Sequence, residues 1–225
     1  MELLERHRAL VGRAAWFSAW FGLVLGQLHA LARFRTADGR SDLESGLVRA
    51  WAEPADDALH QLLGWADADL VYVTYGKLWL PVFVAFFLCA LLVHRQRRPR
   101  GFEKGAWRVV LVAYGAACLS VVGEYWTQWS GDPNALLDTV FLVSIPVVLV
   151  TMLGSTVLGV TLLRRGVRPR ASAWLLALAF PLALVVTSVT SMGNIVLPIA
   201  FAFGLLGRRM AQPVPAAPAA SPAAA

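Results

Sequence analysis

Charged side chains are scarce in this sequence. Only 15% of its 225 residues are Asp, Glu, Lys or Arg, whereas 58% are hydrophobic. Soluble domains carry about 25% charged residues, so this composition excludes an ordinary soluble globular protein. The mean hydropathy of +0.60 points the same way. We therefore expect an integral membrane protein.

Cysteine and the usual catalytic or metal-binding motifs are also rare or missing. The two cysteines, Cys89 and Cys118, lie inside apolar runs, where a thiol more often packs as a small side chain than forms a disulfide. The chain contains no CxxC, CxxCH, HExxH or GxSxG pattern. We accordingly predict no catalytic residues, no metal ligands and no cofactor, and we interpret the protein as not an enzyme.

Lysine is nearly absent, because Lys77 and Lys104 are the only two among 20 basic residues. The net charge of +6 does not indicate a nucleic-acid partner, since the basic residues crowd short loops between apolar runs and form no single stripe. We interpret them as topology signals and as contacts for anionic membrane lipids. The loop arginines are Arg95, Arg97, Arg98, Arg100, Arg164, Arg165, Arg168 and Arg170.

The apolar runs predict six membrane spans, since each is long enough, or nearly so, to cross roughly 30 Å of bilayer hydrocarbon. The stretch 171–207 would make one helix of about 55 Å, so the polar segment 190–194 is taken as a turn that divides it. The predicted fold is an all-α integral membrane bundle, one domain over residues 1–210, followed by a disordered Pro/Ala-rich tail at 211–225. The predicted spans are about 14–32, 70–93, 106–125, 136–163, 171–189 and 195–207.

Arginine placement predicts the orientation, because positively charged loops stay on the cytoplasmic side of the membrane. With six spans, 15 of the basic residues lie inside and five outside. Five spans would export Arg208 and Arg209, giving 13 against seven, so six are favoured. Both termini are then cytoplasmic, and we expect a multi-pass protein of the bacterial cytoplasmic membrane.

The first span has a competing interpretation as a cleaved signal peptide, because Ala30-Leu31-Ala32 has the form of a cleavage site. At about 19 residues the run exceeds a typical signal core, and it carries Trp16 and Trp20, so we interpret it as a retained span.

The longest polar segment, about residues 33–69, is predicted to form a cap of short amphipathic helices outside the membrane. Ser41-Asp42-Leu43-Glu44 has the pattern of a capping box that would open one helix, and Glu53-Pro54 would start a second.

Small residues recur every four positions in the first span, at Ala14, Ser18, Gly22, Gly26 and Ala30. Gly22 and Gly26 form a GxxxG step, which allows close approach of another helix in lipid. We expect Ser18, Gly22 and Gly26 to mediate helix packing.

Residues 158–209 resemble a group of uncharacterised actinobacterial polytopic membrane proteins. In that group a span ends in Leu-Gly-x-x-Leu-Leu-Arg, a Gly-Val-x-Pro-Arg turn follows, and a Trp-containing span precedes a short last span ending in Leu-Leu-Gly. The resemblance implies the six-span layout and no activity. Its matching residues are Leu158-Gly159, Leu162-Leu163-Arg164, Gly166-Val167-Arg168-Pro169-Arg170, Trp174 and Leu205-Leu206-Gly207, with Arg208 in place of the group's usual final aromatic residue.

Ionisable and polar groups at membrane depth are costly and mark candidate sites. Gln27, His29, Glu124 and Asp138 all fall towards the outer ends of their predicted spans. They could form an outward-facing polar cluster that relays protons or binds a cation, or they could merely anchor helix ends in the headgroup region beside Arg33. A second set of polar residues, which could line a path for a solute or simply bond their own helix backbone, comprises Ser144, Thr151, Ser155, Thr187, Ser188, Thr190 and Ser191.

Two functions follow from these features. The first is a non-enzymatic scaffold or interaction protein that packs with itself or with another membrane protein through the small-residue face. The alternative is a small-solute or ion-coupled permease that uses the outward-facing polar cluster.

Overall fold

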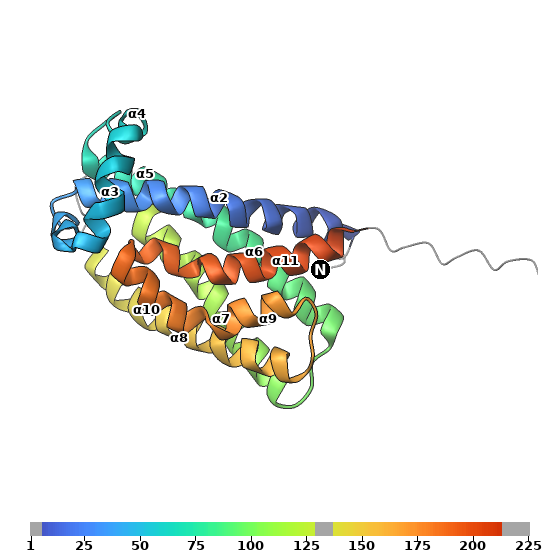
Figure 1. Ribbon diagram of the computed structural model, residues 1–225. Helices are drawn as coiled ribbons and strands as arrows, with labels where there is room; N and C mark the ends of the chain where they lie inside the picture. The colour runs from blue at the N-terminus through green and yellow to red at the C-terminus, as the bar shows by residue number, and fades with distance from the viewer. Residues whose placement is uncertain (1–5, 129–136, 213–225) are drawn as a thin grey trace, which may run out of the picture.

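The computed structural model describes residues 6–128 and 137–212, and for 137 and 138 the backbone alone. The described residues form an all-α bundle with no strand, which confirms the predicted fold class at that level (Figure 1). The long helices run side by side, and the short helices between residues 46 and 63 gather at one end. The helices are α2 (Arg8–Arg35), α3 (Gly46–Ala58), α4 (His60–Leu63), α5 (Ala68–Lys77), α6 (Trp79–Arg97), α7 (Phe102–Val121), α8 (Leu137–Arg164), α9 (Arg170–Ala177), α10 (Ala179–Val189) and α11 (Leu197–Ala211), joined by the shorter turns η1 (Arg40–Glu44), η2 (Val122–Trp126) and η3 (Met192–Val196).

Five helical segments of the described chain are long and apolar enough to span a membrane, and a bent pair would make a sixth. The five are Arg8–Arg35, Ala68–Arg97, Phe102–Trp126, Thr139–Arg164 and Met192–Ala211, and the bent pair is α9 with α10. The predicted spans fall within these segments, apart from the first three residues of the fourth span, 136–138. Most of the helices extend further at their ends.

The predicted span over 171–189 consists of two helices in the structure. The axes of α9 and α10 differ by 63°, with the break at Leu178. Pro181 explains the break, because it has no N–H to donate to the carbonyl of Ala177 four residues earlier. Pro81 has the same relationship to Lys77 at the junction of α5 and α6, where the Lys77 carbonyl accepts instead from Trp126 Nε1 at 3.2 Å.

The cap also differs from its prediction. Ser41 caps no helix, since its hydroxyl donates to the Asp38 carbonyl and residues 40–44 form a 3₁₀ turn. The first cap helix begins at Gly46 and continues through Pro54 instead of ending before it. The cap remains a separate small core of buried residues packed on the end of α2, which includes Phe34, Val48, Ala52 and Leu63.

The helices α2 and α11 form a close antiparallel pair (Figure 1). A Cβ on Gly12 would overlap the backbone of Gly207, and a Cβ on Gly26 would overlap the side chain of Asn194. Gly204 lies against Ala15 and Ala19. Small residues on both helices therefore allow their backbones to approach.

The packed face of α2 is formed by Gly12, Ala15, Ala19, Gly22 and Gly26. Ala14 is exposed and Ser18 is only partly buried. Steps of four residues drift by about 40° each around a helix of 3.6 residues per turn, so a stripe built only from such steps leaves the contact face. Of the three residues predicted to mediate packing, Gly22 and Gly26 lie on the packed face of α2, whereas Ser18 lies at its edge.

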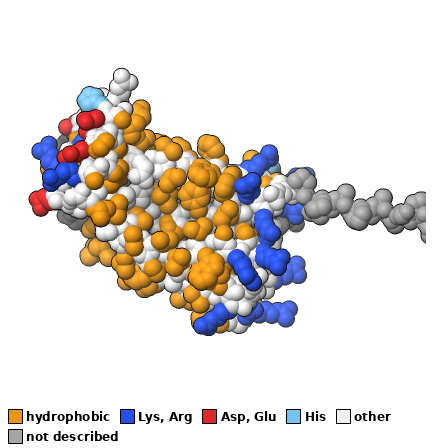
Figure 2. Space-filling view, viewed as in Figure 1, with side chains coloured by type: hydrophobic (Ala, Val, Ile, Leu, Met, Phe, Trp, Pro, Cys, Tyr) orange, Lys and Arg blue, Asp and Glu red, His pale blue; other side chains and the backbone are white. Residues whose placement is uncertain are grey.

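Charge is distributed unevenly along the bundle. An apolar belt covers the middle, Lys and Arg gather at the end where α6, α8 and α11 finish, and acidic residues lie on the cap (Figure 2). We call these ends the basic end and the cap end. The first and last described residues both lie at the basic end (Figure 1).

Candidate functional site

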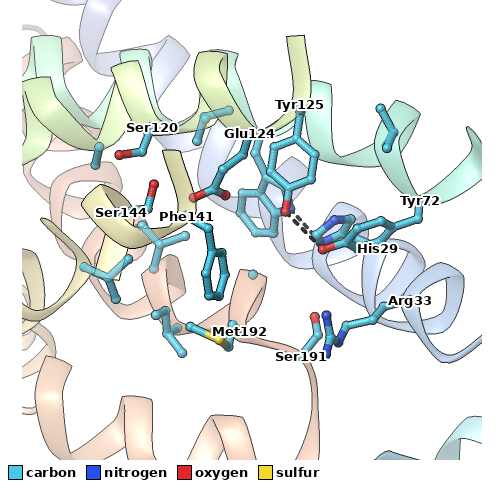
Figure 3. Close-up of a pocket in the computed structure, with 18 of the residues that line it drawn as sticks. His29, Arg33, Tyr72, Ser120, Glu124, Tyr125, Phe141, Ser144, Ser191 and Met192 are labelled. Carbon is cyan, nitrogen blue, oxygen red and sulfur yellow. Dashed lines mark hydrogen bonds between the residues drawn. The ribbon is translucent and has the colours of Figure 1, made fainter. Parts of the chain in front are cut away.

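A cavity of about 530 Å³ lies in the cap-end half of the bundle. Its walls come from α2, α5, α6, α7, η2, α8 and η3, so it occupies the space between the long helices (Figure 3). Most of the wall is apolar and includes Phe83, Phe141, Val148 and Met152. A few polar side chains interrupt it, an arrangement typical of small-molecule sites.

His29 on α2 is 2% exposed and lines this cavity. Its ring stacks on Tyr72, with centroids 4.6 Å apart and an interplanar angle of 10°. Trp79 Nε1 donates to His29 Nδ1 at 3.3 Å, so Nδ1 is the acceptor and the ring proton resides on Nε2. Nε2 has no hydrogen-bond partner within the described residues. His29 therefore presents an unused N–H donor, at Nε2, in the cavity wall.

Glu124 enters the cavity from η2, where the helix widens into a π-helical turn. Such turns are uncommon and occur frequently at functional sites, because the extra residue redirects the side chains around it. The Glu124 carboxylate points towards Ser144 of α8 (Figure 3). In the part of the chain that the structure describes, no Lys, Arg or His forms an ion pair with it.

The same turn places Tyr125 against α5. Its ring packs directly on Gly76, where a Cβ would overlap it. Its hydroxyl lies 3.3 Å from that of Tyr72, and its ring meets His29 edge to face at 5.6 Å. Tyr72, His29 and Tyr125 thus form one aromatic wall of the cavity (Figure 3).

Two further buried hydroxyls line the cavity besides that of Ser144. Thr151 is 2% exposed and Ser191 is 3% exposed, and neither side chain has a hydrogen-bond partner among the described residues. Buried polar groups are normally paired, so these unused groups around one space, together with His29, are suited to contact a polar ligand.

Carboxylates outnumber cations around the cavity. Asp38 and Asp69 lie at its cap-end rim and Glu124 lies deeper, whereas Arg33 is the one Lys or Arg in the described lining. Arg33 is already paired, because its Nε donates to Asp42 at 3.2 Å.

The predicted polar cluster is brought together in part. His29 and Glu124 line the same cavity, together with Ser144, Thr151 and Ser191 of the second polar set. Gln27 is half-buried and lines no part of it. Asp138 belongs to α8, but its side chain lies outside the described part of the chain.

The loop arginines lie at the basic end, and two of them form a cluster that sequence reasoning missed. Glu103 is buried and accepts hydrogen bonds from Arg97 Nε at 2.9 Å and from Trp107 Nε1 at 3.3 Å. It also forms an ion pair with Arg165, whose Nε lies 3.2 Å from the carboxylate. This cluster joins the loop between α6 and α7 to the loop between α8 and α9. Glu103 is the one acidic residue in the basic segment 94–108, and this isolated negative charge was the feature of the sequence that could have indicated the cluster.

Among the described residues, no group of three or more His, Cys, Asp or Glu side chains is placed to hold a metal ion. No protein-family model matches the chain, and no curated protein or solved structure is significantly similar to it.

Proposed function

We propose that the protein is a six-span permease for a small solute in the bacterial cytoplasmic membrane, with both termini in the cytoplasm. The arginine-rich basic end faces the cytoplasm in this proposal, where its loops contact anionic lipid headgroups. The cavity then faces outwards. The observation that carries the proposal is this cavity, in which His29, Glu124, Thr151 and Ser191 supply polar groups at membrane depth within apolar walls.

The closed state of the basic half supports the same proposal. Trp107, Tyr114, Phe86 and Phe203 are almost completely buried there, and their rings pack edge to face or tilted against one another. Beyond them, Glu103 joins the two basic loops. A cavity in the cap-end half above a packed basic half is the arrangement expected of an outward-facing permease.

The scaffold interpretation depended on a free small-residue face, and this face is covered by the chain itself. Gly22 lies against Val82, Leu197 and Trp79, while Gly26 lies against Asn194 and Trp79. A homo-oligomer or another membrane protein would have to bind elsewhere on the apolar belt. We therefore favour the permease over the scaffold.

The proposal is tested by filling the cavity. Wild-type protein is reconstituted in proteoliposomes and given isotopically labelled amines, sugars, amino acids and carboxylic acids under an inward gradient. Thr151→Trp places a large ring in the cavity, whereas Thr161→Trp alters the same helix near the basic end, away from the cavity.

At least one solute should enter vesicles containing wild-type protein or Thr161→Trp, but not vesicles containing Thr151→Trp. The melting temperature of each variant shows whether it is folded. Uptake of no solute class above protein-free vesicles, or equal uptake by folded Thr151→Trp, would contradict the permease.

A further inference from the structure

The polar lining of the cavity is biased towards negative charge. Asp38, Asp69 and Glu124 line it, and none of them forms an ion pair within residues 6–128 and 139–212. The opposing Arg33 is engaged by Asp42 outside the lining. We infer that the cavity takes an organic cation, namely an amine or quaternary ammonium or phosphonium group on an apolar body. This inference rests on the proposed function and names its substrate class.

Glu124 is the group that would meet the positive charge. It lies on the cavity wall near Ser120, Ser144 and Phe141 (Figure 3). A carboxylate without a cation at membrane depth is costly, and a bound cation removes that cost. An anionic ligand would instead face the Glu124 carboxylate, with Asp38 and Asp69 exposed at the rim.

The aromatic wall favours the same charge. Tyr72, Tyr125 and Phe141 line the cavity, and the faces of such rings attract cations, including those that lack hydrogen-bond donors. His29 does not oppose this attraction, because its Nδ1 accepts from Trp79 and the ring is the neutral form.

The three unpartnered groups provide the second line of evidence for a ligand. His29, Thr151 and Ser191 are each at least 97% buried, line the cavity and leave a polar atom unused in the described chain. Thr151 and Ser191 hydroxyls accept from an ammonium N–H, and the apolar wall formed by Phe83, Val148 and Met152 accommodates the rest of the molecule. The volume of about 530 Å³ is that of a site for a drug-sized ligand.

The test uses two probes of nearly the same shape and opposite charge. Binding of tritiated tetraphenylphosphonium is measured on the purified full chain in phosphatidylcholine nanodiscs, with protein-free nanodiscs subtracted. Unlabelled tetraphenylphosphonium and tetraphenylborate are the competitors. The variants are Glu124→Gln, which removes the charge at nearly constant shape, and Glu44→Gln, which changes an exposed carboxylate of the cap that does not line the cavity.

We expect saturable binding of the phosphonium ion, displaced by its unlabelled form and not by the borate. Glu124→Gln should weaken it by about tenfold or more, since the loss of one partner of a desolvated charge pair is costly. Glu44→Gln should bind as wild type. Thr151→Trp should abolish binding through steric exclusion.

Each other outcome overturns the inference. Displacement by borate as strong as by phosphonium, or unchanged affinity in Glu124→Gln, would show that charge does not select the ligand. If Thr151→Trp still abolished binding in those cases, the cavity would remain the binding site and the proposed function would stand. Absence of phosphonium binding would overturn the inference that the ligand is an organic cation. The solute-uptake experiment would then test the proposed permease function independently.

Discussion

Asn194 of η3 lies directly against the backbone of Gly26 on α2. Its Nδ2 donates to the Gly26 carbonyl at 3.3 Å and also to the Thr190 hydroxyl at 3.0 Å. Because Gly26 has no side chain, Asn194 can approach the backbone of α2 beside Trp79. The contact joins the first and last spans at the level of the cavity.

Gly26→Ala should therefore destabilise the protein. The new methyl group would overlap the Asn194 side chain and crowd Trp79. Overpacking of this kind costs about 1–3 kcal/mol, so the melting temperature in detergent should fall. Gly105→Ala is the control, because a Cβ there meets nothing within 4 Å, and it should be neutral or stabilising by up to about 1 kcal/mol as a helical Gly→Ala change. Equal melting temperatures for the two variants would contradict the close contact.

The Glu103 cluster leads to a second prediction about stability. The Glu103 side chain is only 2% exposed, and its carboxylate pairs with both Arg97 and Arg165. Glu103→Gln removes that buried charge. Hydrogen bonds to a charged group contribute about 1.5–3 kcal/mol, so we expect a loss of about 2 kcal/mol in the free energy of unfolding. Glu53→Gln breaks the ion pair with Arg49, whose partners are 52% and 67% exposed, and should cost less than about 0.5 kcal/mol. Similar losses in both would contradict the structural role of Glu103.

The spans could be predicted from the sequence because each depends on a local property, the length of an apolar run. Breaks within a span depend on backbone details instead. Pro181 and Pro146 both lie in apolar runs, yet α9 and α10 are separate helices around Pro181 while α8 continues through Pro146. Hydropathy does not distinguish these two prolines.

The cavity could be predicted only in part. Placing His29 and Glu124 at the same end required nothing beyond the number and direction of the spans. Tyr72 lies near a span end, a position typical of an interfacial aromatic residue, so its sequence position alone does not assign it to a cavity wall. Its contact with His29 depends on the rotation of α5 about its axis, and the π-helical turn at η2 changes the rotation of Glu124 and Tyr125 as well. No sequence pattern specifies either rotation.

A third prediction concerns Tyr114 and Ser155, whose hydroxyl oxygens are 2.8 Å apart in the buried core between α7 and α8. Ser155 also donates to the Thr151 carbonyl at 2.6 Å, so Tyr114 is the donor in the first bond. Ser155→Ala leaves the buried Tyr114 hydroxyl without this acceptor and should cost about 1–3 kcal/mol. Tyr114→Phe leaves Ser155 bonded to Thr151 and should cost less. Chemical unfolding in detergent measures both, and a larger loss in Tyr114→Phe would refute this asymmetry.

The orientation of the bundle gives the last prediction. Ser41 is exposed on the cap and Arg168 is exposed in the loop between α8 and α9, so single cysteines at these positions report the two ends. Only Cys118 needs to be replaced first, by Cys118→Ser, because Cys89 is fully buried. A membrane-impermeant maleimide should label Ser41→Cys in intact bacterial cells and Arg168→Cys only after the membrane is permeabilised, since arginine-rich loops are retained in the cytoplasm. Labelling of both positions in intact cells, or of neither, would place the two ends on one side of the membrane and rule out a bundle whose α2, α6, α7, α8 and α11 cross it.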